Sequence, residues 1–383
     1  MEHTAYFDNA ATTFPKPEAV YRFLDSFYRE CGVNVGRGQH KLAAKAAALV
    51  ADTRKRLLEL NHCPAHSVVF RPSATEALNI TLNGVINRDN LNIYLTPFEH
   101  NAVVRPINHI AQTFRLNIYA LVFNKGESRY DIDAIRAQFA KNKPDIVIAS
   151  HASNVCGAIV PFREIFSLSK RYGAVNVVDM CQTMGLIDTD ISSEVIDYTV
   201  FAAHKMLYGS LGLGGFICKS NSYLPPLLYG GTGVDSASLL MPDALPDRFE
   251  AGSQNIHAIA GLYAALNWIK ETGIEVIYEK ERENHHRLLD IFKKHDNISV
   301  VGGMEESIGV ISCRFDGYSA DDIGRFLSER NIAVRTGLHC APGAHHFLGT
   351  FPAGTVRFSA GYFNDNVDFE QLEEVLNFIH ANS

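Results

Sequence analysis

The sequence predicts an α/β fold with a mostly parallel central sheet in a large domain, followed by a smaller α+β domain. Two patterns along the 383 residues support this prediction. In the first two-thirds of the chain, short apolar runs alternate with amphipathic stretches, which is typical of strands joined by covering helices. In the last third, a long helical region precedes two or three strands and two helices, which favours a second, smaller unit.

The strand and helix patterns can be placed along the first two-thirds of the chain. An almost uninterrupted apolar run at 145–150 is typical of a strand buried on both faces. Further strands are predicted at 67–70, 92–96, 116–123, 174–180, 197–203 and 214–218. Helices are predicted at 73–86, 99–114, 131–142 and 161–172. Ligands of such sheets bind beyond the carboxyl ends of the strands, so residues there are the first candidates for a functional site.

The last third begins with a long helical region at 255–295. Strands are predicted after it at 298–303, 309–315, 332–337 and 355–362, and helices at 319–331 and 368–381. We place the domain boundary near residue 255. The large domain then comprises residues 15–255, and the small domain comprises residues 1–14 and 256–383.

The composition indicates a folded protein without general affinity for polyanions. Hydrophobic residues make up 46% of the chain and charged residues 20%, which provides for a sizeable core. The net charge of −7 predicts no attraction to nucleic acid or to an anionic membrane. No apolar stretch approaches the roughly 20 residues that span a bilayer. The N-terminal residues do not resemble a secretory signal, so we expect a cytoplasmic protein.

The cysteines argue against a disulfide framework. Their number is odd and their spacings are irregular, so a reducing compartment is the expected environment. No C-x-x-C pair occurs, which weakens a structural zinc site. The seven cysteines are Cys31, Cys63, Cys156, Cys181, Cys218, Cys313 and Cys340. All except Cys340 lie mostly in strand-like or helix-like contexts, and we interpret them as structural.

The residues after the first predicted strand could bind an anion. Ser73 and Thr75 precede an apolar helical run, and Glu76 completes a capping-box pattern with Ser73. A well-capped helix explains this pattern by itself. The functional alternative is a phosphate group bound by the N–H groups at the helix N-terminus and by the nearby hydroxyls.

Polar residues after two other predicted strands are ambiguous on their own. His100 follows strand 92–96 at the start of a helix, but a lone histidine is more often structural. Asn154 follows strand 145–150 and could hydrogen-bond a ligand or form a turn.

An acid and a lysine follow the next two strands. Asp179 ends a buried apolar run, where an ionised carboxylate needs a partner. Lys205 follows strand 197–203, with His204 before it and a glycine-rich loop behind it. Burial depresses the pKa of a lysine and makes it a useful nucleophile, although either residue could instead be half of an internal ion pair.

Together, the capped helix, the buried acid and the buried lysine match the needs of pyridoxal phosphate. The lysine would bond covalently to the cofactor, and the phosphate would sit at the helix start. The acid would keep the pyridine nitrogen protonated, so that the ring can accept electrons.

The chain resembles the class V aminotransferase family of fold-type I pyridoxal-phosphate enzymes, and within it the cysteine desulfurases and selenocysteine lyases. The resemblance runs nearly from end to end and rests on short motifs. These motifs are YFDNAATT (6–13), SATE (73–76), EHNA (99–102), SNVCG (153–157), VDMCQ (178–182), AAHK (202–205), RFEAGSQN (248–255) and RFSAGYFN (357–364).

The resemblance implies roles for the residues around the cofactor ring. Lys205 would bind the cofactor covalently and Asp179 would pair with the pyridine nitrogen. Gln182 would contact the phenolic oxygen of the ring. His100 would stack on the ring and transfer protons. Asn154 would lie near the ring oxygen or the substrate carboxylate.

The resemblance also implies a phosphate site and a homodimer with shared active sites. Ser73, Ala74, Thr75 and His204 would surround the phosphate. Ser253 stands where, in the family, a hydroxyl of the partner subunit reaches the phosphate. Ala74 departs from the family pattern, which has a threonine there, so the phosphate could be held less tightly.

Substrate recognition and the reaction type rest on two further residues. Arg357 would bind the substrate carboxylate in a bidentate manner, as guanidinium geometry favours. Cys340, in RTGLHCAPGAHHFLG (335–349), resembles the reactive cysteine of group II desulfurases. Its thiolate would take the sulfur of L-cysteine as a persulfide, and L-alanine would be released. We expect the neighbouring His339 and the backbone to favour the thiolate.

Several alternatives stay open at this point. The chain could be a selenocysteine lyase acting on L-selenocysteine, or another class V enzyme such as an aminotransferase, an epimerase or a kynureninase-like enzyme. A zinc site at His339, Cys340, His345 and His346 matches no known spacing, so we predict no metal. A sulfur-acceptor protein is an expected partner of a desulfurase, and the sequence does not identify it.

Overall fold

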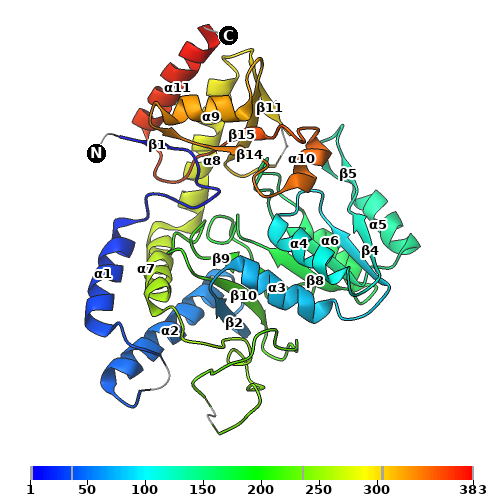
Figure 1. Ribbon diagram of the computed structural model, residues 1–383, viewed down its shortest axis with the longest axis vertical. Coiled ribbons are helices and arrows are strands. Elements are labelled where there is room, and N and C mark those ends of the chain that lie inside the picture. The colour runs from blue at the N-terminus through cyan, green and yellow to red at the C-terminus, as the bar shows by residue number, and fades with distance from the viewer. Residues whose placement is uncertain (1–2, 36–37, 235–236, 303–305, 382–383) are drawn as a thin grey trace.

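The computed structural model describes residues 3–35, 38–234, 237–302 and 306–381, and its centre is a large, mostly parallel sheet (Figure 1). Strands β9, β8, β7, β3 and β4 run parallel, whereas β10 is antiparallel to both of its neighbours. In spatial order the strands are β2 (His66–Arg71), β10 (Gly214–Lys219), β9 (Tyr198–Ala202), β8 (Val175–Asp179), β7 (Ile146–Ser150), β3 (Leu91–Leu95) and β4 (Leu116–Ala120).

Helices cover both faces of this sheet, as the alternating pattern predicted. One face packs against α3 (Ala74–Val85) and α4 (Asn101–Ile110). The other face packs against α2 (Lys41–Leu60), α5 (Ile132–Lys141), α6 (Phe162–Lys170) and α7 (Ile256–Thr272), with α1 (Glu18–Cys31) lying against α2 and α7.

Strand β7 shows why both faces are covered. Ile146 and Ile148 belong to the apolar cluster on the α3 and α4 face. Val147 and Ala149 belong to the cluster on the opposite face. Successive side chains of a strand point to opposite faces, so an uninterrupted apolar run requires two covering layers.

The C-terminal part of the chain forms a second sheet, which is antiparallel and lies at one end of the molecule (Figure 1). Phe292, Phe358 and Phe369 fill its apolar core. Its strands in order are β11 (Ile298–Val301), β12 (Val310–Phe315), β15 (Thr355–Ser359) and β14 (Arg335–Gly337). The helices of this part are α8 (Ile274–Phe292), α9 (Ala320–Ser328), α10 (Pro342–Leu348) and α11 (Asn366–Ala381).

The N-terminal segment joins the C-terminal part. Strand β1 (Ala5–Tyr6) pairs in parallel with β13 (Ile332–Ala333), and Phe7 lies in the same apolar core as Phe358. Residues near the start of the chain therefore lie beside residues more than three hundred positions later. The division into two domains near residue 255 stays a prediction.

The predicted helical region at 255–295 is interrupted. Helix α7 ends at Thr272 and α8 begins at Ile274, because Gly273 adopts a φ of 90° that ends a right-handed helix. Helices α1, α2 and α10 are additions that the sequence patterns did not predict. The strand predicted at 116–123 ends at Ala120, and the short strands β5 (Phe123–Asn124) and β6 (Arg129–Tyr130) pair beyond it.

Candidate active site

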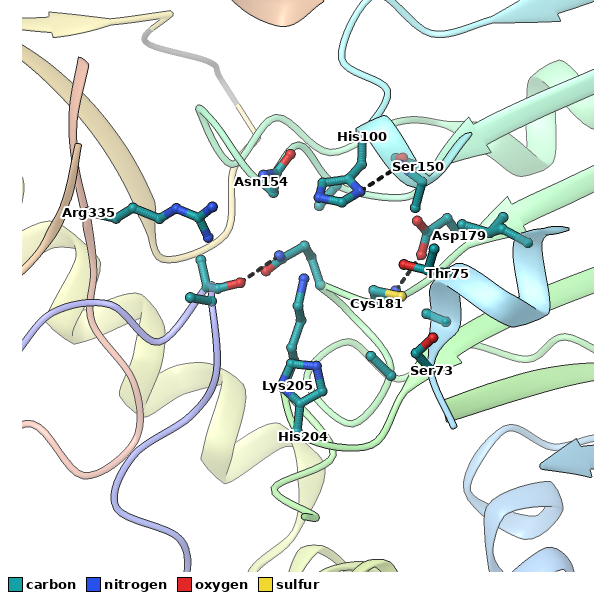
Figure 2. Close-up of a pocket in the computed structure, with 18 of the residues that line it drawn as sticks. Ser73, Thr75, His100, Ser150, Asn154, Asp179, Cys181, His204, Lys205 and Arg335 are labelled. Atoms are coloured by element: carbon teal, nitrogen blue, oxygen red, sulfur yellow. Dashed lines mark hydrogen bonds between the residues drawn. The ribbon is translucent and has the colours of Figure 1, made fainter. Parts of the chain in front are cut away.

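A cavity opens where the carboxyl ends of the parallel strands meet the C-terminal part of the chain (Figure 2). Most of the residues expected in the site line it. They are Ser73, Ala74, Thr75, His100, Asn154, Asp179, Gln182, His204, Lys205 and Arg357. Cys340 lies next to this lining, and Ser253 lies in a different hollow of the chain, beside Gly212 and Asn255.

The start of α3 forms one end of the cavity. Ser73 is the N-cap residue, and its hydroxyl accepts a hydrogen bond of 3.2 Å from the backbone N–H of Glu76. The Glu76 carboxylate pairs with Arg71 rather than reaching back to the cap, so only half of the capping box forms. A Cβ atom at Gly214 would lie 2.6 Å from the backbone N of Ala74, so only glycine lets β10 approach the helix start.

Lys205, just after β9, lines the cavity. Burial lowers the pKa of its amine. The backbone carbonyl of His204, directly before Lys205, accepts hydrogen bonds from Thr12 Oγ1 at 2.9 Å and from Lys16 Nζ at 2.7 Å. The N-terminal segment therefore fixes the backbone on which Lys205 stands.

Asp179 is the last residue of β8 and faces the same cavity. Its Oδ1 accepts a hydrogen bond of 2.9 Å from the backbone N–H of Cys181. Cys181, which we interpret as structural, also lines the cavity. Burial, and then the charge of Asp179, raises the pKa of the Cys181 thiol well above its usual value, which keeps the thiol protonated.

Several polar atoms of the described lining lack partners, among them one of Gln182 and one of His204. The Nε2 atom of Gln182 donates to the carbonyl of Ala10 at 2.9 Å, but its Oε1 is buried without a hydrogen bond to any described residue. The Nδ1 atom of His204 is buried in the same way. Because unpaired buried polar atoms are rare, they indicate that a polar ligand belongs in the cavity.

His100 caps α4 and points its ring into the cavity (Figure 2). Its Nδ1 accepts a hydrogen bond of 3.0 Å from the backbone N–H of Ala102, which places the ring proton on Nε2. Burial, followed by the nearby charge of Lys205, lowers the pKa of His100 to about 4. The imidazole is therefore neutral at physiological pH.

Arg357 enters the cavity from β15 and is 1% exposed. Its Nη2 atom lies 2.6 Å from Asp8 Oδ1, and its Nη1 atom donates to the carbonyl of Asn154 at 3.0 Å. Its Nε is buried and has no hydrogen-bond partner in the described chain. The guanidinium is thus held by two protein groups and keeps N–H groups for a ligand.

Cys340 lies in the turn between β14 and α10. Its carbonyl accepts a hydrogen bond of 2.7 Å from the backbone N–H of Asn101, which ties the turn to the start of α4. The Nη2 atom of Arg335 lies 3.2 Å from Cys340 Sγ, and the Arg335 side chain lines the cavity. Sequence reasoning missed Arg335, which lies inside the strand predicted at 332–337 and is the first residue of β14.

His339 does not favour the thiolate as expected. Its ring is 2% exposed and its Nε2 is hydrogen-bonded to Thr355 Oγ1 at 2.8 Å. Burial, and then the charge of Arg357, lowers the pKa of His339 to about 2, so the ring carries no positive charge. The cation beside Cys340 is Arg335 instead.

The described residues hold neither a metal-ligand cluster nor a helix that could span a membrane. They contain no group of three or more histidine, cysteine or acidic side chains placed to hold a metal ion. Nor does any helix within the described ranges have the length and apolar character needed to cross a membrane.

The fold and the cavity define a ligand-binding α/β protein whose site combines a lysine, an acid and a helix N-terminus. The family model of the class-V aminotransferases matches residues 5–372. The chain therefore belongs to the class-V aminotransferase family, as the motifs predicted. Enzymes of this family generally depend on pyridoxal phosphate.

Relatives and solved structures support this assignment over nearly the whole chain. A cysteine desulfurase of Shigella flexneri is 31% identical over 385 residues, covering 98% of this chain and 93% of the relative. A probable cysteine desulfurase of Xylella fastidiosa is 30% identical, covering 96% and 88%. The apo structure of a cysteine desulfurase from Thermococcus onnurineus NA1 superposes with a TM-score of 0.91 at 26% identity, covering 99% of this chain and 95% of that one. The predicted fold-type I architecture is confirmed.

Proposed function

We propose that this protein is a pyridoxal-phosphate-dependent cysteine desulfurase that converts L-cysteine to L-alanine and transfers the sulfur to Cys340. The observation that carries the proposal is the position of Cys340. Its Sγ lies 3.2 Å from Arg335, and Arg335 lines the cavity together with Lys205 and Asp179. The names of the relatives support the same activity.

The lining residues fit the cofactor. The start of α3, with the hydroxyls of Ser73 and Thr75, offers the N–H groups and positive dipole that suit a phosphate. The unpaired atoms of Gln182 and His204 offer further hydrogen bonds. When bound, pyridoxal phosphate supplies an electron sink that stabilises negative charge at the carbon next to the substrate amine.

The chain itself supplies charge control and proton transfer. Asp179 provides the carboxylate that suits the pyridine nitrogen. Because burial lowers the pKa of Lys205, its amine can act as a base once it is free and can return a proton later. The neutral ring of His100 offers a hydrogen bond from Nε2 without adding a charge.

Arg357 would position the substrate. Its two protein contacts leave the Nε–H and further N–H groups free for a carboxylate. This arrangement suits the bidentate pairing that a guanidinium forms with a carboxylate.

Cys340 would act as the nucleophile. Its thiolate would attack the substrate sulfur, so that an S–S bond forms and the carbon–sulfur bond breaks. The electron pair of the broken bond stays with the carbon, which takes up a proton to give alanine. The guanidinium of Arg335 stabilises the thiolate electrostatically before the attack.

We further propose a cytoplasmic homodimer in which Ser253 reaches the cofactor phosphate of the partner subunit, and a protein acceptor that takes the sulfur from Cys340. Ser253 is exposed and lies away from the candidate active site of its own subunit, which supports a site shared between two subunits. The seven cysteines are all free, which is compatible with a reducing compartment.

The test compares wild type with Cys340→Ala, measuring alanine and sulfide from L-cysteine together with the visible spectrum. We expect Cys340→Ala to keep the cofactor absorbance and to lose sulfur transfer. Cys218→Ala, which changes a buried thiol in β10, is the matched control and should keep turnover.

Two results would contradict parts of this proposal. Full turnover of L-cysteine by Cys340→Ala would exclude the persulfide. Turnover of L-selenocysteine alone by the wild type would identify a selenocysteine lyase instead. Lys205→Ala should lose the absorbance of the covalently bound cofactor, and retention of that absorbance would contradict the assignment of the lysine.

A further inference from the structure

Glu99 is a buried carboxyl group that the reaction proposed above does not use. It lies in the turn between β3 and α4, directly before His100, and is 3% exposed. Its Oε1 accepts hydrogen bonds from Thr96 Oγ1 at 2.6 Å and from the backbone N–H of Ser150 at 2.9 Å. Its Oε2 lies 2.7 Å from the hydroxyl of Ser150.

Ser150 connects this carboxyl group to the cavity. It is the last residue of β7, and its side chain lines the cavity near His100 and Asp179 (Figure 2). A single hydroxyl therefore separates Glu99 from the space in which a ligand would bind.

Glu99 also lies beside a second space. It lines a groove on the other side of the turn, together with Thr96, Lys125 and His346. This groove lies beside β4, which is an edge strand of the central sheet. Glu99 thus stands between the groove and the cavity.

The hydrogen bonds determine which oxygen of Glu99 can carry a proton. The Thr96 hydroxyl accepts from the backbone N–H of Phe98 at 3.3 Å, so its own proton points to Glu99 Oε1. With the N–H of Ser150, this oxygen already receives two donors. Only Oε2 is left to carry a proton, and such a proton would point to the Ser150 hydroxyl.

The charge of Glu99 therefore decides what Ser150 offers to the cavity. When Glu99 is ionised, the Ser150 hydroxyl donates to Oε2 and presents only acceptor lone pairs to a ligand. When Glu99 is protonated, Oε2–H donates to the Ser150 oxygen, and the hydroxyl proton is free to point into the cavity.

Both states are accessible near neutral pH. Burial raises the pKa of Glu99 to about 7, the hydrogen bonds from Thr96 and Ser150 lower it, and the charge of Asp179 raises it. Tyr130 of β6 faces the same carboxyl group, and its own pKa is raised by burial and by the charge of Glu99. On the groove side, the charged or titratable side chains are those of Lys125 and His346.

We propose that Glu99 is a positioning residue that, through the hydroxyl of Ser150, controls the proton that the cavity wall offers to a bound ligand. As Ser150 gives its proton to the ligand, Oε2–H of Glu99 passes its proton to the Ser150 oxygen. Glu99 becomes a carboxylate and recovers a proton from water in the groove.

Infrared spectroscopy of the cofactor-free protein tests the hydrogen-bond part without any turnover. The carbonyl stretch of a protonated carboxyl group should disappear as the pH rises through neutrality, and Glu99→Gln should remove that component. Ser150→Ala should shift both its frequency and its midpoint. Glu281→Gln is the matched control, because Glu281 is also buried, with a pKa raised to about 7, but is bonded to Tyr208.

The kinetic part rests on the proposed function and uses the pH profile of kcat. The glutamine amide keeps an acceptor in place of Oε1 and a donor toward Ser150, but it cannot pass on a proton. Glu99→Gln should therefore lower kcat as Ser150→Ala does, and the pH profile of kcat should lose its limb near neutral pH. Ser150→Ala should lower kcat about 100-fold or more, and the kcat of the double variant should be no lower than that of Ser150→Ala.

The outcomes separate this proposal from the proposed function. If no amino acid is turned over but the infrared band behaves as expected, the proposed reaction is wrong and the proposed coupling between Glu99 and Ser150 is supported. If Ser150→Ala leaves the Glu99 band unchanged, or if Glu99 stays ionised in acid, the proposed coupling is overturned. Should Glu99→Gln fail to fold, the spectra of wild type and Ser150→Ala still decide.

Discussion

The two walls of the cavity are held in place by different means. The first wall comes from the central sheet, where Asp179 ends β8 and Lys205 follows β9. Asp179 is positioned by its own strand and the short turn behind it, and Lys205 by its strand and by the N-terminal segment that bonds the carbonyl of His204. Neighbouring parallel strands then bring the groups together, because their carboxyl ends meet at one edge.

The second wall comes from the C-terminal part and depends on contacts between distant residues. Arg357 is held by Asp8, and Cys340 is held by Asn101 and Arg335. His339 and Cys340 have positive φ values of 47° and 57°, which non-glycine residues seldom adopt without surrounding support. We therefore expect a substitution in the first wall to affect mainly the substituted residue. A substitution in the second wall should change both the charge in the cavity and the positions of the neighbouring side chains.

The largest effect that would sharpen this comparison is expected at Arg357. Arg357→Lys keeps the charge but loses the planar fork that bonds Asp8 and Asn154 while facing the ligand. We expect KM for L-cysteine to rise about 10- to 100-fold, the value of one or two charge-assisted hydrogen bonds, with a smaller change in kcat.

Steady-state kinetics and the cofactor spectrum measure this effect together. Arg22→Lys, which alters an exposed arginine of α1, serves as the control and should leave KM unchanged. An unaltered KM in Arg357→Lys would mean that the second wall does not bind the substrate carboxylate.

A smaller effect is expected at Arg335. Arg335→Gln removes the cation 3.2 Å from Cys340 Sγ, so the thiolate loses electrostatic stabilisation of about 1 kcal/mol. Alkylation of Cys340 by iodoacetamide at neutral pH should slow about fivefold. Mass spectrometry of the modified peptide follows the rate.

The control for this experiment is Arg325→Gln, because Arg325 pairs with Asp322 on the surface of α9. Equal alkylation rates in Arg335→Gln and wild type would contradict this prediction, because the reactivity of Cys340 would then depend on its own turn and not on Arg335.

The smallest effect is expected in the first wall, at Ser73. Ser73→Ala removes the side-chain cap of α3 and should lower the free energy of unfolding by about 1 kcal/mol, whereas Ser73→Thr should keep most of it. Urea unfolding of the cofactor-free protein measures this change. The rate of Cys340 alkylation should not change, and a slower rate would show that the two walls are coupled.

Local patterns in the sequence were enough to predict much of the first wall. Apolar runs such as 145–150 mark buried strands, and the polar residue that ends such a run lies at the carboxyl edge of the sheet. His100, Asp179 and Lys205 could be placed in this way, and the family motifs agreed with them. Helices α1 and α2 were not predicted, because our predictions followed the alternation of strands and helices, and no strand-end motif lies in that part of the chain.

The correction at His339 comes from the packing of the fold. The charge of His339 could not be predicted, because its low pKa results from burial against other parts of the fold and from the nearby charge of Arg357. The sequence also did not show that Cys181 lines the cavity, where it lies near Asp179, two residues before it, and near Lys205 from the next strand.

By itself, the sequence therefore predicted the central sheet, the order of most of its strands and covering helices along the chain, and the chemical groups at the strand ends. These features follow from hydrophobic periodicity and short motifs, which act over a few residues. Only the tertiary structure decided that Asp8 holds Arg357, that Arg335 meets Cys340 and that Glu99 reaches the cavity through Ser150. Asp8 and Arg357, and Glu99 and Ser150, lie far apart along the chain, and Arg335 meets Cys340 only through the turn between them. No local pattern records which partner a side chain meets once the core is packed.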